Sequence, residues 1–68
     1  MYLLEQLRRA AGLSQRKLGR MCNPEVDAAT ISKAESGYCR LYPGQAARVA
    51  AALDYDGDPM DLCEEVVS

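Results

Sequence analysis

The sequence lacks histidine altogether, and its cysteines, Cys22, Cys39 and Cys63, are few, odd in number and scattered. Three distant cysteines without histidine make a poor zinc site and cannot all pair as disulfides. The chain also lacks a glycine-rich phosphate loop and a nucleophile placed beside a base. We therefore expect no metal, no cofactor and no enzymatic activity. Because no secretory segment accompanies the cysteines, we expect a cytoplasmic protein without a membrane partner.

One acidic segment carries a competing signal for calcium. Asp54, Asp56, Asp58 and Glu65 stand at positions 1, 3, 5 and 12 of a calcium-binding loop. The position that requires glycine holds Pro59 instead, and too little chain follows to form the second helix of such a motif. We interpret the segment as a polar turn followed by a helix cap.

The length of 68 residues predicts a single domain, residues 1–68, with a small core. Cores of this size rarely supply more than about 3 to 5 kcal/mol of stability, so a partner subunit is the expected support. The net charge of −2 is unevenly distributed. Residues 1–40 hold seven basic and four acidic side chains, whereas residues 41–68 hold one basic and six acidic ones. The first part of the chain can therefore present a positive face to an anionic partner.

Apolar residues at helical spacing predict an all-α fold. A first helix is expected over residues 2–11 and ends at Gly12. Later helices begin at Pro43 and, after the cap residue Asp58, at Pro59. Two further helices lie between these, which gives five helices in total.

The two central helices, within residues 14–36, have the spacing of a helix-turn-helix. Ser14 can cap the first of them, and Asn23 suits a left-handed position at its end. Asp27 can cap the second helix, and Gly37 can terminate it. The pattern predicts two short helices packed across a tight corner.

The outward face of the second helix is narrow, because Ala29, Ser32, Lys33 and Ser36 are short or flexible side chains at helical spacing. The major groove of B-DNA is about 12 Å wide and admits one such helix. Double-stranded DNA is therefore the partner that this face favours. A solvated face in an ordinary small helical bundle is the alternative.

Three segments, LRRAAGLSQRKL, ATISKAESG and RVAAALD, resemble the repressors of lambdoid phages, the Cro proteins and related bacterial regulators. The resemblance covers nearly the whole chain, although Pro24 and Glu25 look like an insertion in the corner. It implies a compact five-helix DNA-binding domain. It also implies a sequence-specific transcriptional regulator, a repressor of phage or prophage type, that acts as a homodimer on the nucleoid.

By position, the resemblance assigns base reading to Gln15, Ala28, Ala29, Ser32 and Lys33. The alanines depart from the pattern, because alanine cannot form the bidentate hydrogen bonds that read guanine or adenine. Its methyl group can still pack on a thymine methyl.

The resemblance further implies a largely buried ion pair between Arg8 and Glu35. This pair joins the first helix to the second helix of the helix-turn-helix, which is the recognition helix. The remaining expected DNA contacts are to the backbone, where hydrogen-bonding and cationic side chains hold phosphate and sugar. The residues expected to make these backbone contacts are Arg16, Lys17, Tyr38 and Arg40.

The apolar residues near the end of the chain favour self-association, because a small domain that leaves such a face open tends to cover it. We expect Leu62, Val66 and Val67 to form this dimer contact. The alternative function is an antitoxin or another protein-binding module. In that case the terminal face engages a different protein and DNA contact is secondary.

Overall fold

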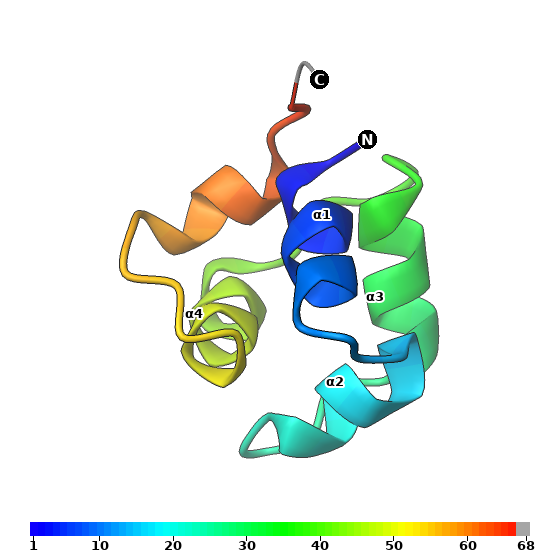
Figure 1. Ribbon diagram of the computed structural model, residues 1–68, viewed down its shortest axis with the longest axis vertical. Coiled ribbons are helices and arrows are strands. Elements are labelled where there is room, and N and C mark those ends of the chain that lie inside the picture. The colour runs from blue at the N-terminus through cyan, green and yellow to red at the C-terminus, as the bar shows by residue number, and fades with distance from the viewer. Residues whose placement is uncertain (67–68) are drawn as a thin grey trace.

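The computed structural model describes residues 1–66, and its helices all pack around one small core (Figure 1). The elements are α1 (Leu3–Ala10), α2 (Gln15–Met21), α3 (Ala28–Glu35), α4 (Pro43–Ala52) and a short 3-10 helix, η1 (Pro59–Cys63). The secondary structure of the described residues is thus helical apart from one isolated bridge, as the apolar spacing predicts. The expected fifth α-helix is a single 3-10 segment instead, in which Asp58 accepts the N–H of Met60 at 3.0 Å.

The predicted ends of α1 and α3 agree with the structure at their glycines. Gly12 and Gly37 both take positive φ, +71° and +78°, where a residue without Cβ is favoured. The N-terminal end of α1 differs from the expectation, because Tyr2 pairs with Glu65 in an isolated antiparallel bridge. Val66 also donates its N–H to the carbonyl of Met1 at 2.8 Å. Residues 1–2 and 65–66 are therefore held side by side (Figure 1).

The corner between α2 and α3 is only partly as expected. Ser14 caps α2 by accepting the N–H of Lys17 at 3.0 Å. Asn23 is not in the left-handed region, because α2 stops at Met21 and the chain continues extended through Cys22. Asp27 occupies the N-cap position of α3 without a hydrogen bond from its side chain.

Gly19 allows the corner between α2 and α3 to approach α2 closely. Glycine in a helix interior costs about 1 kcal/mol of stability relative to alanine. A glycine at this position therefore predicts that another helix approaches its backbone closely. The close segment is the corner itself: a Cβ at Gly19 would collide with the carbonyl of Val26, whose N–H donates to the Gly19 carbonyl at 3.0 Å. The insertion at Pro24 and Glu25 thus folds back onto α2, and the Asn23–Pro24 peptide bond is cis.

Every helix contributes a fully buried side chain to the core. These residues are Leu4, Leu18, Ile31, Val49 and Leu62. The burial of Leu62 corrects the expectation that it lies on an open dimerisation face, because η1 packs against α1 and α4. Val66 is half-buried, and Val67 lies outside the described residues.

Candidate nucleic-acid interface

Arg8 lies at the centre of a polar network that joins α1, α2 and α3. Its Nε and NH2 groups donate to the two carboxylate oxygens of Glu35 at 2.6 and 3.0 Å, and its NH1 donates to the Leu13 carbonyl at 2.7 Å. Both side chains are largely buried, with exposed fractions of 13% for Arg8 and 4% for Glu35. The hydrogen bond to Glu35 raises the pKa of Arg8 above its ordinary value, so the guanidinium stays charged. The predicted buried ion pair is confirmed.

Gln15 belongs to the same network, a role that its place in the sequence did not indicate. Its Nε2 donates to Glu35 at 3.0 Å from the first turn of α2. One N–H of the Gln15 amide is therefore engaged by Glu35, while its second N–H and its carbonyl oxygen remain for a base edge or a water. Base reading by Gln15 stays a prediction.

The outward face of α3 agrees with the expected pattern of exposure. Ala29, Ser32 and Lys33 are exposed, whereas Ala28 is half-buried at the start of the helix. Lys33 forms no ion pair with an acidic side chain of residues 1–66, so its ammonium group is available to an external anion or base. Ile31, Ala34 and Glu35 are buried on the opposite face.

The exposed side of α2 gathers three cations beside the beginning of α3. Arg16, Lys17 and Arg20 are exposed, and none pairs with an acidic group of the described chain. Arg16 and Arg20 line one hollow together with Ala28, which places them next to the first turn of α3. Arg20 was not among the predicted backbone contacts, although its spacing of four residues from Arg16 places both on one face of the helix and could have made it a candidate.

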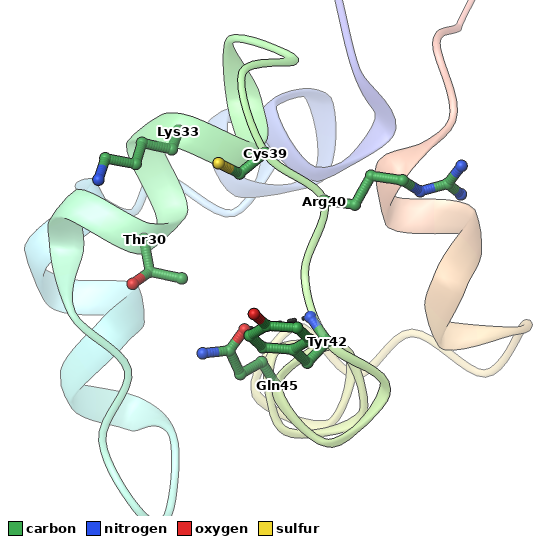
Figure 2. A pocket seen from close by; sticks show the side chains of 6 residues that line it. All are labelled: Thr30, Lys33, Cys39, Arg40, Tyr42 and Gln45. Carbon is green, nitrogen blue, oxygen red and sulfur yellow. Dashed lines mark hydrogen bonds between the residues drawn. The ribbon is translucent and has the colours of Figure 1, made fainter.

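The loop after α3 carries two residues that were predicted to contact the DNA backbone, and their side chains lie in different surroundings. Tyr38 is 77% exposed and available to a partner. The guanidinium of Arg40 instead points away from α3 (Figure 2), and its NH2 lies 3.7 Å from Glu64. Both members of this pair are 67% exposed, so it is a weak interaction that does not hold Arg40 in place.

A hollow of about 410 Å³ separates α3 from the first turn of α4 (Figure 2). Thr30 and Lys33 contribute to its α3 side, while Tyr42 and Gln45 form its α4 side. Thr30, Tyr42 and Gln45 were not predicted to lie together, because they become neighbours only when α3 and α4 pack. The remaining lining residues are Cys39 and Arg40.

A short helix with an exposed polar face, packed against a cationic helix across a tight corner, defines a DNA-binding class of domain. Residues 3–62 match the family of helix-turn-helix domains, and the chain belongs to that family. No curated protein and no solved structure matches the chain. Among residues 1–66, no helix is long and apolar enough to cross a membrane.

Proposed function

We propose that this protein is a sequence-specific regulator of transcription that binds double-stranded DNA as a homodimer. By its resemblance to lambdoid repressors and Cro proteins, we propose a repressor of phage or prophage type, working on the nucleoid in the cytoplasm. The proposal assigns it binding alone, with no catalytic step and no cofactor.

The observation that carries the proposal is the surface shared by α2 and α3. Arg16, Lys17 and Arg20 form no ion pair with an acidic group of the described chain. Arg16 and Arg20 line one hollow with Ala28, in the first turn of the helix whose narrow face carries Ser32 and Lys33. Cations beside a groove-sized helix suit a duplex, where the phosphates flank the base edges. This arrangement supports DNA binding despite the overall charge of −2.

Specificity then depends on few side chains. Lys33 is the only long hydrogen-bonding side chain on the outward face of α3, and lysine donates well to the O6 and N7 of guanine. Ala28 and Ala29 can contribute only packing against thymine methyl groups. Such a reader also depends on DNA shape at positions that it does not touch.

Selection from a random-sequence duplex library, followed by gel-shift assays, tests this proposal directly. Enrichment of a palindrome is expected, with half-sites centred about 10 to 10.5 bp apart or a multiple of that spacing. Failure to enrich any sequence would contradict sequence-specific binding. Enrichment of a single unrepeated half-site would contradict the dimer.

One observation favours the alternative of an antitoxin or protein-binding module. A second hollow, of about 400 Å³, lies between the end of α2 and α4, and apolar side chains dominate it. Its apolar lining residues are Met21, which is 45% exposed, and Ala47, Ala51 and Ala52. If the library selection yields no sequence, this surface is the place to seek a protein partner.

A further inference from the structure

We propose that Ala29 contacts the C5 position of a pyrimidine base, so that methylation of cytosine at that position strengthens the binding of this protein to DNA. This inference rests on the proposed function. It names the chemical class of base that the start of α3 accepts, the C5-methylated pyrimidine, which includes 5-methylcytosine as well as thymine. Methylation of the DNA thereby regulates binding at the same site.

The first turn of α3 presents a methyl group, and no polar side chain, on its outward face. Ala29 is exposed there, whereas Ala28 is half-buried and Ile31 is buried in the core. Thr30, the polar side chain of this turn, instead lines the hollow between α3 and α4. Recognition helices contact base edges with their N-terminal residues. The outward side chain of this turn can therefore make only an apolar contact with a base.

The apolar group that bases present in the major groove is the substituent at C5 of a pyrimidine. Thymine carries a methyl group there, and cytosine carries a hydrogen atom. Methylation of cytosine supplies the same methyl group and leaves its N4 donor and its pairing with guanine unchanged. An alanine side chain that packs on thymine therefore also packs on 5-methylcytosine, and it loses this contact on unmodified cytosine.

Lys33 adds a polar contact at a defined distance from Ala29. Residues four apart lie on one face of a helix, separated by about 6 Å along its axis, and successive base pairs are about 3.4 Å apart. Lys33 is exposed and forms no ion pair with an acidic side chain of residues 1–66, so it can donate to guanine. The two residues thus fit a C5 methyl group and a guanine one or two base pairs apart, as in a methylated cytosine-guanine step.

Base analogues test the inference without any change to the protein. The probes are derivatives of the duplex enriched by library selection, altered at one pyrimidine position at a time. Two affinity ratios are measured at each position: thymine over uracil, and 5-methylcytosine over cytosine. At the position that Ala29 contacts, both ratios should be about fourfold, the value expected for burial of one methyl group. At positions that the protein does not contact, both ratios should be near one.

The substitution Ala29→Gly removes the methyl group of the protein and should bring both ratios close to one. Ratios within one variant are compared, because glycine also destabilises the helix, and this cost is the same for both duplexes of a pair. Ala47→Gly is the matched control, since Ala47 is exposed on α4 and lines none of the hollows beside α3. That variant should keep both ratios at the wild-type value.

Ratios near one at every pyrimidine position of the wild-type complex would overturn the inference. Ratios that persist in Ala29→Gly would also overturn it, because the methyl group would then act through the shape of the DNA. An enriched palindrome that is insensitive to C5 methylation would overturn the inference alone. Failure of the wild type to enrich any duplex would overturn the proposed function together with it, so the two failures are distinguishable.

Discussion

At the scale of single residues, two neighbouring arginines of α1 take opposite roles. Arg8 is largely buried and hydrogen-bonded to Glu35, whereas Arg9 is 63% exposed and pairs with Glu5 at 2.7 Å on the helix surface. Both form ion pairs, but only the first is shielded from water. Burial therefore decides how much each pair contributes to stability.

We predict that Arg8→Ala destabilises the domain by about 3 to 5 kcal/mol, because it strands the buried Glu35 carboxylate. Arg9→Ala is the matched control and should cost about 1 kcal/mol or less, since exposed pairs contribute little. Thermal or urea unfolding of both variants measures the difference. Equal melting temperatures would show that the buried pair carries no special weight.

At the scale of elements, α4 ends in a strained residue. Asp54 follows the helix with a φ of +56°, in the left-handed region that favours glycine, and the Tyr55 N–H closes the turn on the Ala50 carbonyl at 2.9 Å. Asp54 also places a negative charge at the end of a helix where the backbone dipole is already negative.

Replacing Asp54 with glycine should therefore stabilise the protein by about 0.5 to 1 kcal/mol, because it relieves the left-handed backbone and removes the unfavourable charge. Asp56→Gly is the control, since Asp56 is exposed but does not take positive φ. That variant should be neutral or slightly destabilising. A melting temperature for Asp54→Gly no higher than that of Asp56→Gly would contradict the prediction.

Substitutions in the two helices of the helix-turn-helix should change DNA binding in different ways. Lys33→Ala, on α3, should narrow the gap between selected and random duplexes by about 1 to 3 kcal/mol, because it removes the main base-edge donor. Arg16→Ala, on α2, should weaken binding to both the selected and the random duplexes. It should also reduce the steepness of log affinity against log salt by about 0.9. Affinities for both duplexes across a salt series check this. If Lys33→Ala weakens binding to the selected and the random duplexes by the same factor, Lys33 contacts phosphate and not a base edge.

At the scale of the whole molecule, Leu62 ties η1 into the core and cannot serve the proposed dimer contact. We predict that Leu62→Ala costs about 2 to 5 kcal/mol through a core cavity. The melting temperature of Leu62→Ala should be lower than that of the wild type at every protein concentration. The melting temperature of Leu62→Val should lie between those of the wild type and Leu62→Ala. Val66→Ala is the comparison, because Val66 is half-buried beside Met1. A loss in Leu62→Ala that disappears at high concentration would restore a role in self-association.

Local signals in the sequence were sufficient for much of the fold and for part of the site. Periodic apolar residues, the Ser14 cap and the glycines at 12 and 37 located the helices, because these signals act over a few neighbouring residues. The cations of α2 and the narrow face of α3 were equally visible as spacing along single helices. The pairing of Arg8 with Glu35 came from resemblance, and the structure confirms it.

Only the tertiary structure decided which groups from different helices meet. It buried Leu62, turned the Gln15 amide onto Glu35 and drew Arg40 toward Glu64, all through contacts between residues far apart in the chain. It also placed Gln45 opposite Thr30. No local signal encodes such neighbours, because they depend on how the helices pack, and packing is set by the whole core at once.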